Sequence, residues 1–265
     1  MILASASGTD IVMSATAAGV YLYPAAVGDR LSLRARRAAA LAAWLLHAAV
    51  LAWSLFGRTP RFGFAPALSV TAWLVLTVYA VEREVFPQLQ LQRALAVLGA
   101  ASVLLAVAFP GVPLHPAASP LLPLHWALGI ASYGLFAAAV LHAWLLRRSE
   151  QAIRRADTPQ GGLPLLTLER LTFRFAAAGF VLLSATLLAG TLFSEYFYGR
   201  AWRWEHKTVF SFLAWGAFAL LLLGRARFGW RGRTAVRVLY TGSILLLLAY
   251  VGSRFVLEVV LGRVA

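Results

Sequence analysis

The sequence contains five histidines and no cysteine, so imidazole nitrogens are its main soft ligands for a metal or cofactor. An imidazole placed within an apolar segment costs free energy unless it forms a hydrogen bond or coordinates a ligand. The five are His47, His115, His125, His142 and His206. Each is therefore a candidate for a structural hydrogen bond or for coordination chemistry.

His125 and His206 form the most informative pair because each stands where an apolar run begins, at 124–146 and at 208–223. If both runs start at the same membrane surface, two helices present an imidazole at one depth. Two axial nitrogens about 4 Å apart across a ring are what a planar iron porphyrin requires. A ridge of Gly129, Ser132 and Phe136 continues inward from His125, and its small residues would admit a flat ligand. The alternative is a pair of interfacial histidines bonded to water.

Aromatic and basic side chains surround both histidines in the sequence. The aromatic candidates for contact with a macrocycle are Trp126, Trp202 and Trp204, and the cationic candidates for its propionates are Arg200, Arg203 and Lys207. Tryptophan also collects at membrane surfaces whatever the function. An interfacial aromatic belt is therefore the alternative interpretation of this loop.

The other three histidines differ in their expected depth. His47 lies ten residues after Arg37, about 15 Å along a helix, which puts it near the centre of the bilayer. It is a second candidate for cofactor binding, and a structural bond to another helix is the alternative. His142 lies about 25 Å along the helix from His125 and is expected to be structural. His115 stands in a proline-rich loop and is expected to be solvated.

The elements that position these residues are expected to be membrane-spanning helices. Hydrophobic residues make up 61% of the 265-residue chain and charged residues 13%, whereas about a quarter of a soluble domain is charged. The mean hydropathy is +0.76. A helix needs about 20 apolar residues to span a bilayer. Eight apolar runs approach that length, at 11–27, 38–56, 68–81, 94–109, 124–146, 173–193, 208–223 and 238–261. We expect an all-α, polytopic bundle of about eight transmembrane helices in one integral membrane domain, 1–265.

The formal charge of +14 reflects membrane topology rather than binding to nucleic acid. In the eight-span arrangement, 17 of the 24 basic residues fall in the loops of one side and six in those of the other. This asymmetry is the positive-inside pattern, so the basic side is predicted to be cytoplasmic and both termini to lie outside. The segment 1–10 lacks a basic n-region, so we expect the first span to remain in the mature protein. The longest polar segment, 149–172, is expected to form a cytoplasmic turn at Pro159–Gly162.

Sequence signatures of other enzymes are missing: there is no HExxH, no Walker loop and no Gly-x-Ser-x-Gly turn. Three stretches resemble a known family instead. The first is His125-Trp126-Ala127-Leu128-Gly129-Ile130-Ala131-Ser132-Tyr133, the second runs from Glu205-His206-Lys207-Thr208 to Trp215, and the third combines Gly229-Trp230-Arg231-Gly232-Arg233 with 249–255. Over nearly its whole length the chain resembles the cytochrome c assembly superfamily of haem-handling membrane proteins, the CcsA and CcmC proteins, and within it the YpjD and HemX branch.

The resemblance implies a b-type haem held by His125 and His206 as axial ligands, with His47 used in haem transit. It also implies a bacterial inner membrane protein that binds, relays or senses haem in cytochrome c maturation or haem homeostasis, with maturation proteins as partners. Gly199, Trp202, Trp204 and Glu205 resemble a reduced form of the tryptophan-rich haem-binding loop of the larger members. Glutamate stands there in place of aspartate and histidine in place of proline, which favours binding of haem over its attachment to apocytochrome.

Two other classes of function remain open from the sequence. One is a haem-dependent membrane enzyme, either a cytochrome c synthase or a quinone-coupled electron carrier, which would need a second redox centre or an apocytochrome site. The other is a small-molecule transporter without a cofactor, although broken spans with intramembrane charge are few. We favour a binding protein over an enzyme.

Overall fold

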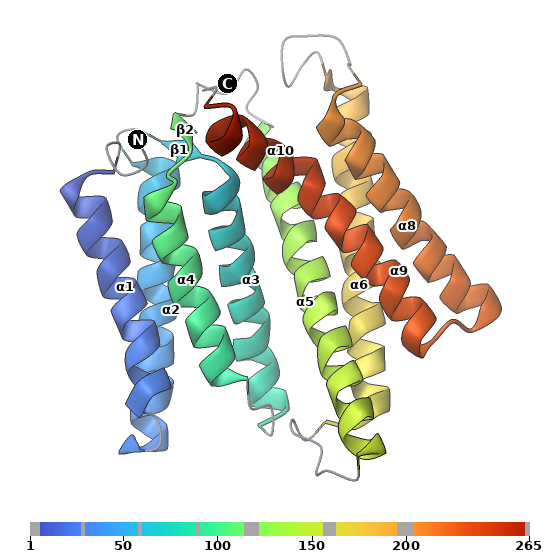
Figure 1. Ribbon diagram of the computed structural model, residues 1–265, viewed down its shortest axis with the longest axis horizontal. Helices are drawn as coiled ribbons and strands as arrows, with labels where there is room; N and C mark the ends of the chain where they lie inside the picture. The colour runs from blue at the N-terminus through green and yellow to red at the C-terminus, as the bar shows by residue number, and fades with distance from the viewer. Residues whose placement is uncertain are drawn as a thin grey trace. The chain divides into compact units, whose positions relative to one another are not determined.

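Eight long helices account for most of the chain in the computed structural model, which describes residues 6–27, 30–57, 60–87, 91–113, 122–155, 163–194 and 204–262 (Figure 1). The helices are α1 Gly8–Val27, α2 Leu33–Phe56, α3 Phe64–Val85, α4 Gln92–Ala108, α5 Leu122–Arg154, α6 Leu165–Leu192, α8 His206–Phe228 and α9 Gly232–Leu247. After α9 the chain stays helical through η2 Leu248–Gly252, α10 Ser253–Phe255 and η3 Val256–Val260.

Seven helices of the described residues are long and apolar enough to cross a membrane, and α4 is a shorter apolar helix. Each of the eight predicted spans corresponds to one of these helices. The predicted all-α polytopic fold is therefore confirmed, whereas the placement of both termini outside and the single domain over 1–265 stay predictions. The short α4, with 17 residues, measures about 25 Å, somewhat less than a typical hydrocarbon core.

Local sequence signals set several helix ends. At the start of α1 the Ser7 N–H donates to Oδ2 of Asp10 at 2.7 Å and the Asp10 N–H donates to Oγ of Ser7 at 3.2 Å, a reciprocal capping box. Ser32 caps α2 by accepting from the Ala35 N–H. Gly229 ends α8 in the left-handed conformation, at φ 63°, which glycine adopts without steric cost.

The predicted polar segment 149–172 is more helical than expected. Helix α5 continues to Arg154 and α6 begins at Leu165, so helix occupies both flanks of the segment. Arginine, glutamate and glutamine are good helix formers, and Glu150 pairs with Arg154 one turn later at 3.7 Å. The expected turn at Pro159–Gly162 lies outside the described residues.

The chain divides into two compact units. Unit 1 comprises Met1–Leu114 and Arg254–Ala265. In it α1 packs on α2 and α4, α3 packs on α4, and β1 (Arg61–Phe62) pairs antiparallel with β2 (Val112–Pro113). Gly99 of α4 lies against Tyr21 of α1, where an added Cβ would be 2.9 Å from the tyrosine ring. Glycine thus permits the close approach of these two helices.

Unit 2 comprises His115–Ser253 and contains α5, α6, α8 and α9. Helix α5 packs on α6 and α9, while α8 packs on α6 and α9. Phe136 of α5 and Phe218 of α8 are almost completely buried at the centre of its core. The Tyr133 hydroxyl donates to the carbonyl oxygen of Leu246, one residue before α9 ends and the π-helical turn η2 follows. These contacts fix the helices that carry the candidate site.

Candidate functional site

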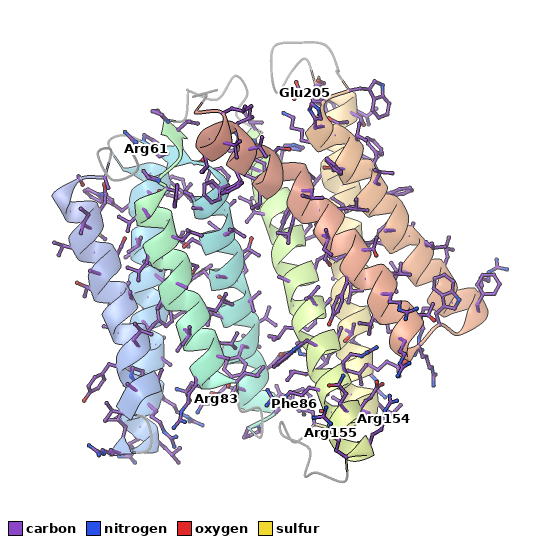
Figure 2. All side chains as sticks on the ribbon, in the orientation of Figure 1. Arg61, Arg83, Phe86, Arg154, Arg155 and Glu205 are labelled. Atoms are coloured by element: carbon purple, nitrogen blue, oxygen red, sulfur yellow. The ribbon has the colours of Figure 1, made fainter. Side chains whose placement is uncertain are left out.

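The first turns of α5 and α8 lie at the same end of unit 2, next to the last turn of α6 (Figure 1). In Figure 2 Glu205 marks this end, and Arg154 and Arg155 at the close of α5 mark the opposite end. Two helix starts and one helix end therefore converge on the predicted haem site. We call this end of unit 2 the histidine end.

His125 lies one turn into α5 and is partly buried. Its ring packs on the α6 backbone, since a Cβ added at Gly190 would lie 3.2 Å from the His125 Cε1 atom. Gly190 is part of this site and was not recognised in the sequence, where it resembled the small residues common in membrane helix packing.

His206 is the first residue of α8 and its side chain is exposed. The adjacent Lys207 pairs with Glu205 at 3.1 Å between Nζ and Oε2. Trp204 is 71% exposed, and its ring lies 6.0 Å from that of Phe212 one to two turns into α8. An exposed imidazole, a flat aromatic face and a cation thus stand within four residues. Trp126 on α5 is partly buried.

The predicted ridge below His125 has two different parts. Gly129 faces Thr186 of α6 at an ordinary contact distance of 3.5 Å for an added Cβ. Ser132 and Phe136 are buried, and the Phe136 ring is covered by Phe218. The inward part of the ridge is therefore filled by packed side chains, and the space expected for a flat ligand is not present there. A ligand at this end of unit 2 must lie at the level of His125.

His47 lies in unit 1, fully buried within α2. Its Nδ1 atom is 3.2 Å from the Tyr21 hydroxyl of α1, and its Nε2 atom is 2.9 Å from the Ser69 hydroxyl of α3. The alternative of a structural bond to another helix is thus confirmed, and the imidazole links three helices. Coordination of haem by His47 stays a prediction, and it would replace one of these two hydrogen bonds.

His142 is also buried and shows a structural arrangement. Its Nδ1 atom lies 2.7 Å from the Ala138 carbonyl oxygen one turn earlier, and its ring lies 5.2 Å from that of Phe175. Within the described part of the chain, no group of three or more His, Asp or Glu side chains could hold a metal ion. Five of the residues singled out above for possible haem contact or ligation lie outside the described residues: His115, Gly199, Arg200, Trp202 and Arg203.

Comparison with protein families gives one match that covers most of the chain. The family described as cytochrome C assembly protein matches residues 35–261. Those residues include nearly all of α2, the helices from α3 to α9 and every histidine discussed above. No solved structure matches the chain.

Curated relatives agree with this family. The chain is 32% identical to the inner membrane protein YpjD of Escherichia coli K12 over 150 residues, which cover 55% of this chain and 56% of that protein. It is 27% identical to the cytochrome c biogenesis protein CcsA of Prochlorococcus marinus MIT 9301 over 232 residues, 77% of this chain and 75% of CcsA. An uncharacterized protein of Azospirillum brasilense is 34% identical over 52% of each chain. The chain spans about half the length of YpjD and of the Azospirillum protein.

Proposed function

The chain belongs to the family of cytochrome c assembly proteins, and we propose that it binds haem b at the histidine end of unit 2. In this proposal it is a multi-pass protein of the bacterial inner membrane, as the name of the Escherichia coli relative indicates for that protein. It binds, relays or senses haem during cytochrome c maturation or haem homeostasis. Proteins of cytochrome c maturation are its expected partners.

One observation carries the proposal: His125 in the first turns of α5 and His206 as the first residue of α8 stand at the same end of unit 2 (Figure 1). Imidazoles from two different helices are thus available at one end of the bundle, as bis-histidine coordination in a helix bundle requires. His125 is held against Gly190 by packing, whereas the exposed His206 has freedom to turn toward a ligand.

The residues around the two histidines fit the chemistry of haem. Bound haem would supply an iron that imidazole nitrogens coordinate, and His125 and His206 would hold it. Trp204 and Trp126 would contact the porphyrin faces, and Lys207 would meet a propionate in exchange for Glu205. Arg200, Arg203 and Trp202, which lie outside the described residues, are further candidates on the sequence evidence alone.

The test is the visible spectrum of the protein purified from haem-replete cells, together with a pyridine haemochrome assay. We expect a Soret band with a b-type haemochrome, and its loss or shift in His125→Ala and in His206→Ala. The matched control is His142→Ala, which removes an imidazole from the same helix α5 but from the opposite half of the bundle. An unchanged Soret band in both site variants rejects the proposed axial ligands.

The same experiment separates the alternative functions. Two haems per chain would favour the electron-carrying enzyme, because electron transfer across the membrane needs a second redox centre. His47 would then be the first residue to test as a ligand. A colourless preparation would favour the transporter without a cofactor.

A further inference from the structure

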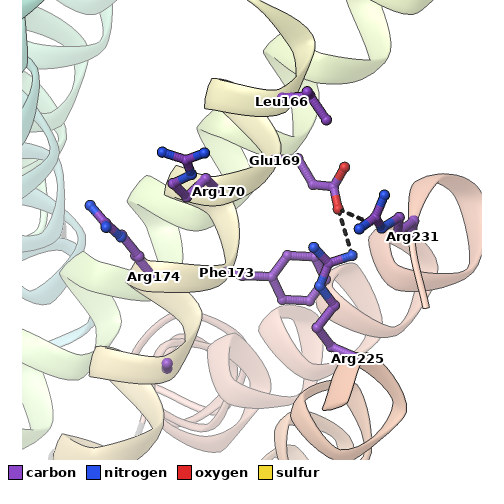
Figure 3. A pocket seen from close by; sticks show the side chains of 8 residues that line it. Leu166, Glu169, Arg170, Phe173, Arg174, Arg225 and Arg231 are labelled. Atoms are coloured by element: carbon purple, nitrogen blue, oxygen red, sulfur yellow. Dashed lines mark ion pairs between the residues drawn. The ribbon is translucent and has the colours of Figure 1, made fainter. Parts of the chain in front are cut away.

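A second candidate site lies at the other end of unit 2, away from the histidine end, where α6 begins and α8 ends (Figure 1). Figure 3 shows it from close by. It is a pocket of about 390 Å³ between α6, the last turn of α8 and the segment after it. The residues that line it are Leu166, Glu169, Arg170, Phe173, Arg174, Ala177, Arg225 and Arg231. Four arginines and one glutamate give the lining a net positive charge of three. We call it the arginine pocket.

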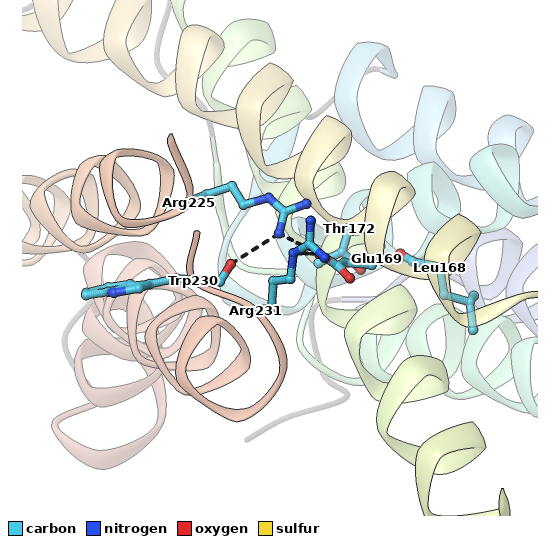
Figure 4. Close-up of polar contacts among 6 residues, drawn as sticks. All are labelled: Leu168, Glu169, Thr172, Arg225, Trp230 and Arg231. Atoms are coloured by element: carbon cyan, nitrogen blue, oxygen red, sulfur yellow. Dashed lines mark hydrogen bonds and ion pairs between the residues drawn. The ribbon is translucent and has the colours of Figure 1, made fainter. Parts of the chain in front are cut away.

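Two of the arginines are held in place by one carboxylate. Glu169 Oε1 lies 2.6 Å from Nη1 of Arg225 and 3.4 Å from Nε of Arg231 (Figure 4). The Arg225 guanidinium also donates to the Trp230 carbonyl oxygen at 3.4 Å and lies 4.7 Å from the centre of the Phe173 ring. Glu169 is mostly buried, with 14% of its side chain exposed. The Arg225 guanidinium is thus held in place before any ligand arrives, whereas the 64% exposed Arg231 makes a weaker second contact.

The Gly229-Trp230-Arg231-Gly232 turn explains how Arg231 reaches this place. Gly229 turns the chain in the left-handed conformation, and the Trp230 N–H donates to the Gly224 carbonyl oxygen at 3.1 Å. The Trp230 ring lies directly on Gly224, where an added Cβ would collide with it. This local packing fixes the turn and directs Arg231 to Glu169. The Gly229-Trp230-Arg231-Gly232 motif therefore positions Arg231 in the wall of the arginine pocket.

The other two arginines, Arg170 and Arg174, are exposed, as Arg231 is. Arg170 and Arg174 lie four residues apart on α6, so both stand on one face of that helix. In Figure 3 their side chains extend from α6 on the side away from Arg225 and Arg231, at the outer edge of the pocket. The apolar part of the pocket wall consists of Leu166, Phe173 and Ala177. The pocket thus combines guanidinium groups with an apolar surface.

We propose that the arginine pocket binds the phosphate group of an anionic phospholipid. Guanidinium groups bind phosphate oxygens through paired hydrogen bonds, and the apolar wall suits the glycerol and the first acyl carbons. Basic pockets between membrane helices on the cytoplasmic side are the usual sites for such headgroups. The pocket lies at the end of unit 2 that the distribution of basic residues predicts to be cytoplasmic. The proposal does not depend on haem binding.

The test measures binding of phosphatidylglycerol to the delipidated full-length protein in a neutral detergent by native mass spectrometry, with phosphatidylcholine as the neutral lipid. We expect tighter binding of phosphatidylglycerol, weakened roughly tenfold or more in Arg170→Gln/Arg174→Gln. The matched control is Arg227→Gln/Arg237→Gln, which removes two exposed arginines from the same end of unit 2 outside the pocket. We expect this control to bind within about twofold of the wild type.

Two further measurements distinguish a lipid phosphate from free phosphate and distinguish a loss of binding from a loss of folding. Inorganic phosphate is added as a competitor, and we expect no displacement of the lipid at millimolar concentration. Displacement would show that the pocket binds free phosphate and would overturn the proposal of a phospholipid ligand. Arg170→Lys/Arg174→Lys keeps the charge, and we expect it to restore most of the binding. Equal affinity for both lipids, or an equal loss in the control double variant, overturns the proposal.

Discussion

The rings of Phe136 and Phe218 stack in the core of unit 2 with their centroids 3.6 Å apart and their planes within 8° of each other. A glycine covers each outer face of the stack. A Cβ added at Gly179 of α6 would lie 3.2 Å from the Phe136 ring, and one added at Gly242 of α9 would lie 2.8 Å from the Phe218 ring. The stack therefore joins all four helices of the unit, and the two glycines leave the room that it needs.

We expect Phe136→Ala to lower the stability of unit 2 by about 2 kcal/mol. The loss comes from the cavity left between Gly179 and Phe218, because transfer of an apolar ring between lipid and protein interior contributes little. The measurement is unfolding of the reconstituted protein by a denaturing detergent. The control is Phe228→Ala, since Phe228 is 76% exposed at the end of α8. Equal losses in the two variants would contradict this account.

The hydrogen bonds of His47 give a second prediction. Ser69→Ala and Tyr21→Phe each leave one buried imidazole nitrogen without its partner, and we expect each to destabilise unit 1 by about 1 kcal/mol. Ser102→Ala is the control, because the buried Ser102 hydroxyl donates only to the Gly99 carbonyl oxygen of its own helix. Thermal unfolding in nanodiscs measures all three. If the control costs as much as the two others, the hydrogen bonds between helices are not the cause.

The arrangement of the fold could be predicted from the sequence to a large extent. Apolar runs bounded by arginine, proline and glycine locate helices in a bilayer, since every backbone polar group there must be satisfied within its own segment. The helix ends were less accurate. The flanks of the 149–172 segment are polar but good helix formers, and hydropathy marks where the apolar run ends rather than where the helix ends.

The sites could be predicted only in part. His125 and His206 could be proposed as ligands because a histidine at the start of an apolar run is a local feature. The partners Tyr21, Ser69 and Gly190 were not, because contacts between helices join residues far apart in sequence. A small residue in a membrane helix has many ordinary packing uses. The arginine pocket was missed for a similar reason: its arginines stand on different segments and were counted only as evidence of topology.

Gly190 offers a test of the histidine end that leaves the proposed ligands unchanged. A valine at position 190 would push against the His125 ring, since even a Cβ comes within 3.2 Å of its Cε1 atom. If His125 coordinates haem, we expect Gly190→Val to reduce haem occupancy or shift the Soret band. Gly216→Val is the control, because a Cβ at Gly216 meets nothing within 4 Å. An identical spectrum in Gly190→Val and the wild type would mean that the haem does not depend on the orientation of His125.

Glu169 gives the last prediction, which concerns the ion pairs of the arginine pocket. Glu169→Gln keeps the shape of the side chain and removes the charge that holds Arg225 and Arg231. Arg231 is 64% exposed, so its pair contributes little, whereas the Arg225 pair is better shielded from solvent, with 30% of the Arg225 side chain exposed.

We therefore expect a loss of about 1 to 2 kcal/mol in Glu169→Gln, between the values for exposed and buried pairs. Glu150→Gln is the matched control, because its pair with Arg154 is longer, at 3.7 Å, and more exposed. We expect that control to lose less than about 0.5 kcal/mol. Thermal unfolding in phosphatidylcholine nanodiscs, free of anionic lipid, measures both variants without a ligand in the pocket. A larger loss in Glu150→Gln than in Glu169→Gln would mean that Glu169 does not organise the two arginines.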